Sequence, residues 1–259
     1  MNNEKRSPLP SGDLLKLRRW NTPTVHNGWE QITLHDPCGR TNREDVQDFM
    51  PQMGSMVGYA VTVVCEPGNP AHLKSQPDAW NEYRRYVASV PGPKIVVVKD
   101  LEGPNFVAAF LGEVNASFHR GVGCVGAIAD AAVRDVDDMT NVGFKVLAKT
   151  LRVGHGYGWP VRWNVPVDVF GCTVQPGELI HADKHGFFVV PQEDEAGLLD
   201  ATLFMDNNEC DNLIPPGRNG AGKQPEQIVQ EMAAGVERFG GMAKQKFHGN
   251  GQPNGHLHR

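Results

Sequence analysis

The sequence predicts an α/β protein, in one domain, with helices on a mixed sheet and a second half rich in strands. Residues 94–99, KIVVVK, are an apolar run between charged ends, which is typical of a strand buried on both faces. Residues 80–87 place their aromatic side chains on one face of a helix. Residues 161–191 alternate apolar and polar side chains, with turns at QPGE and DKHG. These patterns indicate helices on a sheet, followed by a compact group of strands.

Residues that start or stop helices mark the boundaries of the first expected elements. Thr22 and Pro23 are typical of a helix start, with Thr22 as the N-cap and Pro23 in the first helical position. We expect this helix to end before the turn-rich segment HDPCGR. Residues 57–64, VGYAVTVV, are rich in β-branched side chains and predict a strand. The PGP at 91–93 ends the helix that carries the aromatic face.

The middle of the chain alternates short helices and strands. EVNASFHR follows Gly112 and predicts a short helix that Gly121 closes. CVGAIA at 124–129 predicts a buried strand, and we expect a short helix near 136–142 and a strand near 144–148. Long helical patterns then return only after residue 224.

The ends of the chain differ from the middle in composition. Residues 1–11 are basic and polar and predict a mobile arm, whereas residues 248–259 are glycine-rich and predict a flexible tail. The α/β domain is expected over residues 12–200. A C-terminal helical extension is expected over residues 201–247.

Composition and charge exclude several classes of protein. Hydrophobic residues make up 40% and charged residues 21%, as in an ordinary soluble domain. The net charge of −5 argues against binding to nucleic acid, and no apolar run approaches the roughly 20 residues of a membrane-spanning helix. The five cysteines are scattered and form no CxxC pair, which argues against a disulfide framework or a cysteine zinc site. We therefore expect a cytoplasmic protein.

Three motifs resemble known sites without the context that such sites need. GVGCVG at 121–126 matches a dinucleotide fingerprint, but a helix precedes it and a strand follows, which reverses the required order. GRNGAGK at 217–223 lacks the Ser or Thr of a phosphate loop and reads as a linker into the final helix. His181 and His185 lie four residues apart on strand and turn, so their spacing indicates structural or surface histidines rather than a metal site.

Two short pieces of the chain form the candidate site. Gly112, Glu113, Val114 and Asn115 begin a helix, where free backbone N–H groups bind carboxylate or phosphate. Arg134 and Asp135 follow a buried strand, at the sheet edge where α/β folds gather ligands. An arginine stabilises a carboxylate or a developing enolate, and a carboxylate holds a hard divalent cation.

The alternative reading of the second piece is purely structural. Asp135 would then cap the helix that begins at residue 136. Arg134 would pair with one of the neighbouring acids, Asp130, Asp137 or Asp138. The residue types alone leave both readings open.

The order and spacing of these segments resemble the RraA-like family, which includes the 4-hydroxy-4-methyl-2-oxoglutarate aldolases. The series comprises RRWNTPTVHNGWE at 18–30, GEVN at 112–115, GVGCVGAIADAAVRD ending at 135, NVPV at 164–167 and GCTVQPGELIHADKHGFFVVP at 171–191. The resemblance covers roughly residues 12–200. It implies a swivelling-domain-like β/β/α fold, a homotrimer or homohexamer, and sites at subunit interfaces.

The resemblance also implies a role for each site residue. Gly112 to Asn115 would bind the substrate carboxylate through their amides, and Arg134 would stabilise the enolate. Asp135 would ligate Mg²⁺ or Mn²⁺, with waters and substrate completing the octahedron. Glu113 would orient a water on the metal. Glu30 is a weaker candidate for an acid supplied across an interface.

The implied activity is that of a divalent-metal-dependent class II lyase. It would cleave a carbon–carbon bond of a 2-oxo acid to release pyruvate through an enolate, with oxaloacetate decarboxylation as a side activity. One alternative is a non-enzymatic regulator that binds an RNA-degrading endonuclease. Another is a related lyase or dehydratase on a different hydroxy-oxo acid, since Asn115 and Trp159 near the expected pocket could admit a more polar substrate.

Overall fold

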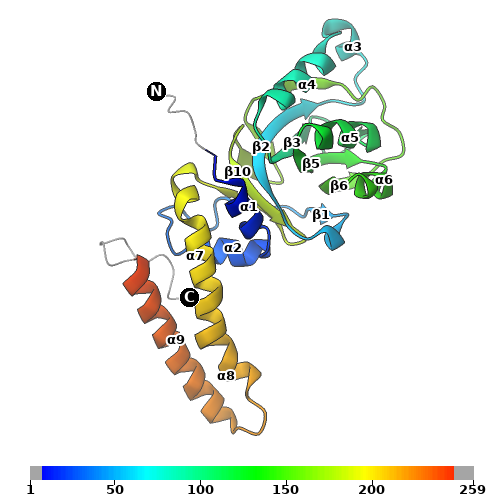
Figure 1. Cartoon of the computed structure of the whole chain (residues 1–259). Helices are drawn as coiled ribbons and strands as arrows, with labels where there is room; N and C mark the ends of the chain where they lie inside the picture. The colour runs from blue at the N-terminus through cyan, green and yellow to red at the C-terminus, as the bar shows by residue number, and fades with distance from the viewer. Residues whose placement is uncertain (1–7, 248–259) are drawn as a thin grey trace. The chain divides into compact units, whose positions relative to one another are not determined.

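A mixed sheet organises the larger part of the chain (Figure 1). A computed structural model describes residues 8–247, in which nine strands form the order β1-β6-β5-β3-β2-β10-β11, with β4 paired to β5 and β7 to β2. The strands of this sheet are β1 (Gln47–Asp48), β2 (Met56–Cys65), β3 (Lys94–Asp100), β4 (Ala109–Leu111), β5 (Cys124–Val133), β6 (Lys145–Leu151), β7 (Pro160–Trp163), β10 (Leu179–Asp183) and β11 (Gly186–Val190). A separate pair is formed by β8 (Val167–Val169) and β9 (Cys172–Val174).

The register of the central strands brings their carboxyl ends to one edge. β2, β3, β5 and β6 are parallel to one another, with Ala60 opposite Ile95 and Ala127 opposite Val146. β7 and β10 run antiparallel to β2, and β1 runs antiparallel to β6. The sheet is therefore mixed, as predicted, and the connections that leave β4 and β5 emerge at the same edge.

The two faces of the sheet have different covers. α4 (Ala79–Ser89), α5 (Glu113–Gly121) and α6 (Val136–Asn141) lie over one face, where Val96 and Val98 of β3 join the core (Figure 1). Ile95 and Val97 point to the other face and pack with β8, β9, β10 and β11. The layers are thus strand pair, sheet and helices, which confirms the predicted β/β/α arrangement. The apolar run of β3 is buried on both faces because both covers are apolar.

Short helices connect these layers. α1 (Ser11–Leu17) buries Leu14 and Leu17, η1 (Pro51–Met53) precedes β2, and α3 (Ala71–Ser75) precedes α4. Lys94, at the start of β3, is buried, and its Nζ donates to the carbonyls of Val87 and Val90 at 2.7 Å each. This ammonium therefore satisfies carbonyls at the end of α4, where the helix macrodipole also favours a positive charge.

The chain divides into two compact units. The first comprises residues 1–22 and 38–192, and the second comprises residues 23–37 and 193–259. Most of α2 (Thr22–Trp29) belongs to the second unit, with η2 (Gln192–Asp194) leading into it. The other helices of the second unit are α7 (Glu195–Asn208), η3 (Glu209–Leu213), α8 (Ile214–Arg218) and α9 (Pro225–Phe247). The expected boundary at residue 200 falls inside α7.

The 14-residue helix α7 corrects the expectation that long helices return only after residue 224. Leu198, Ala201, Thr202 and Met205 are buried at helical spacing, but Leu203 adds an apolar side chain on the opposite face. This second apolar face hides the single-face pattern from which helices are recognised in sequence. The helix also passes directly into η3 and α8, so no glycine marks its end.

Other differences concern element ends. β5 continues to Val133, four residues beyond the predicted end, and β6 continues to Leu151. GVGCVG runs from the last residue of α5 into β5, and GRNGAGK runs from the end of α8 toward α9, so neither motif has the context of a nucleotide site, as predicted. Residues 1–7 of the expected arm and the whole expected tail, 248–259, lie outside the described residues. No helix between residues 8 and 247 is long and apolar enough to span a membrane.

Candidate active site

A pocket of about 160 Å³ lies at the carboxyl edge of the sheet. Three connections form it: β4 to α5, β5 to α6, and the glycine-rich loop that follows β6. Its lining residues are Ala109, Phe110, Gly112, Val114, Asn115, Arg134, Asp135, His155 and Gly158. The structure therefore brings the two predicted pieces, 112–115 and 134–135, to one pocket.

The start of α5 offers free amides to this pocket. The N–H of Ala116 makes the first bond within the helix, to the Gly112 carbonyl at 2.9 Å. The N–H of Glu113 donates to Asp135 Oδ2 at 3.1 Å. The N–H groups of Val114 and Asn115 have no acceptor in the described part of the chain. Two donors at the positive end of the helix thus remain for an anionic ligand.

Asp135 occupies the N-cap position of α6, but its side chain does not cap that helix. It adopts a left-handed backbone conformation, with φ of 55°, at the turn from β5 into α6. Its side chain makes no capping hydrogen bond to α6 and instead accepts the Glu113 N–H. The other oxygen, Oδ1, accepts no hydrogen bond from residues 8–247. An aspartate in this sparsely populated region is uncommon and often functional.

Arg134 pairs within the site rather than with the other acids. Its Nε lies 3.4 Å from Asp135 Oδ2, and its Nη1 donates to the Val153 carbonyl at 3.3 Å. Asp130, an alternative partner considered from the sequence, is instead 2.6 Å from Lys99 Nζ. About one third of the Arg134 side chain is exposed, so donors of the guanidinium remain accessible to a ligand.

The remaining predicted residues take different places. Asn115 is anchored by its Nδ2, which donates to the Phe110 carbonyl at 2.9 Å. Glu113 is exposed and does not line the pocket. Glu30 belongs to the second unit and directly follows α2, and its carboxylate lies 3.4 Å from Nδ1 of His26 in that helix. The interface role of Glu30 stays a prediction.

His155 is a pocket residue that sequence reasoning missed. It lies in the loop RVGHGYGWP after β6, between two glycines, and its side chain is exposed. The sequence feature that could have identified His155 is its position between two glycines, because a glycine-rich loop can approach a site closely. Trp159, which we expected near the pocket, does not line it. Its Nε1 donates to the Gln76 carbonyl at 2.9 Å.

The donor set of the pocket fits a hard divalent cation. Among the described residues, no group of three or more His, Cys, Asp or Glu side chains could hold a metal ion. Asp135 would therefore be a single protein ligand with a free oxygen. Mg²⁺ commonly binds in this way, keeping several waters and sharing oxygens of the substrate. The arrangement suits Mg²⁺ or Mn²⁺ and does not suit four-coordinate zinc.

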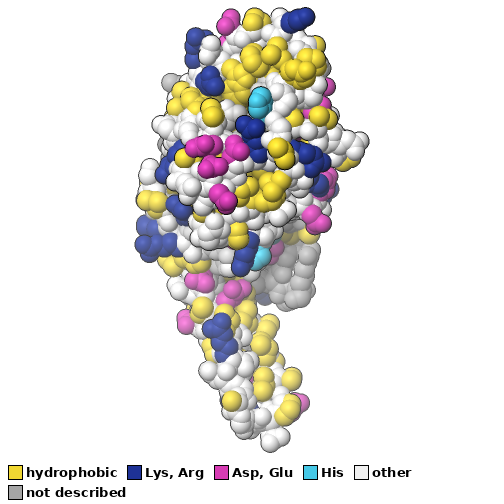
Figure 2. Space-filling model, turned by 90° about the vertical axis from the view of Figure 1, so that its right-hand side faces the viewer, with side chains coloured by type: hydrophobic (Ala, Val, Ile, Leu, Met, Phe, Trp, Pro, Cys, Tyr) yellow, Lys and Arg dark blue, Asp and Glu magenta, His cyan; other side chains and the backbone are white. Residues whose placement is uncertain are grey.

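The surface on this side of the first unit mixes charges of both signs. Figure 2 views the side that carries α5 and α6, and it shows acidic and basic side chains close together, with hydrophobic side chains between them. The exposed hydrophobic residues of the site loops are Val107, Val114, Leu151, Val153 and Tyr157. Of these residues, Val114 also lines the pocket.

Comparisons with known proteins agree on one family. A family model described as RraA-like, Aldolase/RraA, matches residues 22–189. A protein of Ectopseudomonas mendocina named "Putative 4-hydroxy-4-methyl-2-oxoglutarate aldolase" is 33% identical over 144 residues, which cover 53% of this chain and 78% of that protein. A protein of the same name from Halalkalibacterium halodurans is 29% identical over 168 residues, covering 62% of this chain and 71% of that protein.

Solved structures share the fold at low identity. An uncharacterized protein from Pseudomonas syringae pv. tomato has a TM-score of 0.66 at 19% identity, and the match covers 87% of this chain and 96% of the other. RraAS2 of Streptomyces coelicolor, described as an unusual member of the RNase ES inhibitor RraA protein family, has a TM-score of 0.62 at 19% identity. That match covers 79% of this chain and 96% of RraAS2.

Proposed function

Because the chain belongs to the RraA-like (Aldolase/RraA) family, we propose that it is a divalent-metal-dependent carbon–carbon lyase that acts on a 2-oxo acid and releases pyruvate. The relatives named as 4-hydroxy-4-methyl-2-oxoglutarate aldolases support the substrate class. The observation that carries the proposal is the pocket in which Arg134, Asp135 and the free amides of Val114 and Asn115 meet.

Each of these groups has a separate task in the proposed reaction. The amides of Val114 and Asn115, at the positive end of α5, would bind the substrate carboxylate. Asp135 would hold Mg²⁺ or Mn²⁺, which when bound supplies Lewis acidity toward the keto group. Arg134 would place a fixed positive charge beside the keto oxygen, where negative charge develops as the C3–C4 bond breaks.

The same arrangement serves two substrates. Cleavage of an aldol and loss of CO₂ from oxaloacetate both leave the enolate of pyruvate, so both need the charge of Arg134. In aldol cleavage a base must also remove the proton of the C4 hydroxyl, which becomes the carbonyl of the second product. Glu113, exposed in the turn beside the pocket, would orient a water for this step.

The proposal includes a homotrimer or homohexamer in which a neighbouring subunit borders the pocket. The exposed apolar residues of the site loops support it, since Val153 is 94% exposed and Val114 is 78% exposed. Large apolar side chains gathered at one place on a surface mark an interface more often than a solvated face. A neighbour seated there would exclude water from the pocket, which strengthens its electrostatic interactions.

A second candidate is a regulator that binds an RNA-degrading endonuclease. The description of RraAS2 as a member of an RNase ES inhibitor family favours it. Such a role does not need a pocket that joins a carboxylate, a guanidinium and two free amides. The presence of all these groups favours the enzyme. A related lyase or dehydratase that acts on a different hydroxy-oxo acid remains the third candidate.

The test is pyruvate release from oxaloacetate by the purified chain. It is run with Mg²⁺, with Mn²⁺ and with excess chelator, and the spontaneous metal-catalysed rate is subtracted. We expect metal-dependent release that Asp135→Ala abolishes, followed by cleavage of 4-hydroxy-4-methyl-2-oxoglutarate in a substrate panel. Equal rates for wild type and Asp135→Ala would contradict the proposal. Co-purification of an endonuclease by an inactive protein would favour the regulator.

A further inference from the structure

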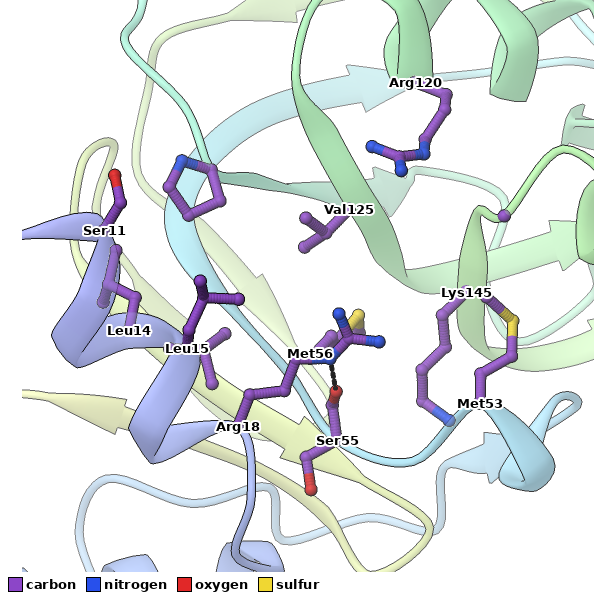
Figure 3. Close-up of a pocket in the computed structure, with 13 residues that line it drawn as sticks. Ser11, Leu14, Leu15, Arg18, Met53, Ser55, Met56, Arg120, Val125 and Lys145 are labelled. Carbon is purple, nitrogen blue, oxygen red and sulfur yellow. Dashed lines mark hydrogen bonds between the residues drawn. The ribbon is translucent and has the colours of Figure 1, made fainter.

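A second, larger pocket lies in the first unit at the opposite edge of the sheet. Its volume is about 420 Å³, and α1, the segment before β2 and the first residues of β5 and β6 line it (Figure 3). Val125 and Lys145 stand at the amino ends of their strands, whereas Arg134 and Asp135 follow the carboxyl end of β5. The two pockets therefore lie at opposite ends of the same parallel strands and share no lining residue.

The walls of this pocket are largely apolar. Leu14 and Leu15 contribute from α1, Met53 and Met56 from the segment around the start of β2, and Val125 from β5. Leu15 is 63% exposed, although it sits on a helix that buries its other leucines. A cavity of this size with such walls is typical of sites for small organic ligands.

The polar groups of the pocket are cationic. Among the described residues that line it, Arg18, Arg120 and Lys145 carry positive charge and none carries negative charge. Lys145 is neutralised, because its Nζ forms a buried ion pair with Asp48 and also donates to the Met50 carbonyl at 2.9 Å. Neither arginine has such a partner in the described part of the chain, so the positive charge of the pocket is not balanced there.

The two guanidinium groups line the same pocket and keep free donors. Arg18 is fixed through its Nε, which donates to the Ser55 carbonyl at 2.9 Å, and its Nη groups bond to nothing else between residues 8 and 247. Arg120, in the last turn of α5, has no side-chain hydrogen bond or ion pair in the same range. Figure 3 shows both side chains extending from different elements toward the space beside Val125. Free guanidinium forks match the geometry of carboxylate-like groups.

We propose that this pocket binds an amphipathic monoanion, with its head group between Arg18 and Arg120 and its hydrocarbon body against Leu15 and Val125. The apolar walls distinguish this ligand from an inorganic anion, which would gain nothing from them. The unbalanced charge distinguishes it from a neutral or cationic amphiphile. The site is separate from the candidate active site, and its test needs no catalytic activity.

The probe is octanoate, titrated calorimetrically into the full-length chain, with acetate and octylammonium as comparison ligands. We expect saturable octanoate binding, at least tenfold weaker acetate binding and no octylammonium binding. Arg120→Gln and Arg18→Gln each lower octanoate affinity at least tenfold, as loss of a charged hydrogen-bond donor does. Leu15→Gln weakens octanoate binding and leaves acetate binding unchanged.

Matched controls separate this site from others. Arg85→Gln, which removes an exposed arginine of α4 outside the pocket, leaves octanoate affinity within twofold of wild type. Arg134→Ala also leaves it within twofold of wild type, because Arg134 lines the other pocket. Both pocket arginines are exposed, so their variants keep the wild-type unfolding temperature. Absence of octanoate binding, equal binding of octylammonium, or loss of binding in Arg134→Ala alone would overturn the proposal.

Discussion

Gly112 and Asp135 approach each other so closely that the glycine has no room for a side chain. A Cβ at residue 112 would lie 2.6 Å from Asp135 Oδ2 and 3.1 Å from Arg134 Nε. The backbone of Gly112 is extended, with φ of −157° and ψ of −171°, so any residue could adopt its conformation. The need for glycine is therefore steric, and it links the start of α5 to the two charged side chains that follow β5.

Gly112→Ala should displace the Asp135 carboxylate and the Arg134 guanidinium while leaving the fold intact. We expect kcat/KM for oxaloacetate decarboxylation to fall at least about tenfold, because misplacement of about 1 Å in a site has a large kinetic effect. Gly121→Ala is the control, since a Cβ at the other end of α5 meets nothing within 4 Å. An alanine at residue 112 with wild-type kinetics would show that the placement of the pair is unimportant.

Arg134→Ala and Asp135→Ala should each lower the turnover number at least about 100-fold, as losses of comparable charge-stabilising groups do. In the proposed reaction Arg134 would supply positive charge beside the keto oxygen, and Asp135 would hold the cation. Asp137→Ala removes an exposed carboxylate in the first turn of α6 and should keep activity within a few-fold of wild type. Steady-state assays with saturating Mn²⁺ measure all three. Near-normal turnover in both site variants would contradict the assignment.

Asp100 at the end of β3 should make the protein less stable as pH rises. Burial raises the pKa of Asp100 to about 6 from 3.8, and its buried Oδ2 has no hydrogen-bond partner among the described residues. The folded state thus holds a proton that the unfolded state releases, so stability present below pH 4 is lost as pH rises through 6. The loss reaches about 3 kcal/mol well above pH 6.

Asp100→Asn should remove this contribution to the pH dependence. The Asn side chain keeps an acceptor for the Glu102 N–H, which bonds Asp100 Oδ1 at 2.9 Å. Urea unfolding at pH 5.0 and 7.5 measures the effect. From pH 5.0 to pH 7.5, the free energy of unfolding of the variant should rise relative to that of wild type by roughly 1 kcal/mol. Asp78→Asn, at an exposed position, is the control and should show no such change.

Two buried histidines should act in the opposite direction. Burial lowers the pKa of His119 and of His181 to about 4 from 6.5. The ring of His119 must donate from Nδ1 to the Asn115 carbonyl at 2.6 Å, so its Nε2 accepts from the Tyr83 hydroxyl at 2.7 Å. His181 is similarly placed between the Leu17 carbonyl and the Thr22 hydroxyl. Both rings are therefore held neutral.

The direction of this pH dependence follows from protonation of the two histidines in the unfolded chain. Each histidine contributes stability that is present above pH 6.5 and is lost as pH falls toward 4, by about 2 kcal/mol per histidine at pH 5. His119→Gln and His181→Gln should each be less stable at pH 7.5 but lose less stability on acidification. Urea midpoints at pH 7.5 and 5.0 check this. A variant that loses as much stability as wild type between pH 7.5 and 5.0 would contradict the assigned protonation state.

Local patterns in the sequence were sufficient to predict the central sheet and the two segments, 112–115 and 134–135, that form the candidate site. The run at 94–99 has one explanation, a strand covered on both faces, and Gly112 and Arg134 follow elements whose ends the sequence marks. The helix α7 escaped prediction because its apolar residues lie on two faces. The contribution of His155 escaped because a loop after β6 reaches the pocket through tertiary structure, which no local pattern encodes. The left-handed turn at Asp135, which directs its carboxylate to the Glu113 N–H rather than to α6, is likewise a feature of the three-dimensional structure that no local pattern shows.

Val153 tests the proposed assembly. Its side chain is 94% exposed, while its carbonyl accepts from Arg134 Nη1, so an apolar surface and the candidate site share one residue. In light scattering the wild type should have at least three times the 28.4 kDa mass of one chain. Val153→Glu should lower that mass, because a charge in an apolar interface is costly to desolvate. The matched variant Val229→Glu, at an exposed valine of α9, should keep the wild-type mass.

A monomeric wild type would contradict the proposed assembly. If Val153→Glu dissociates the assembly and also lowers decarboxylation, the pocket is completed by the neighbouring subunit.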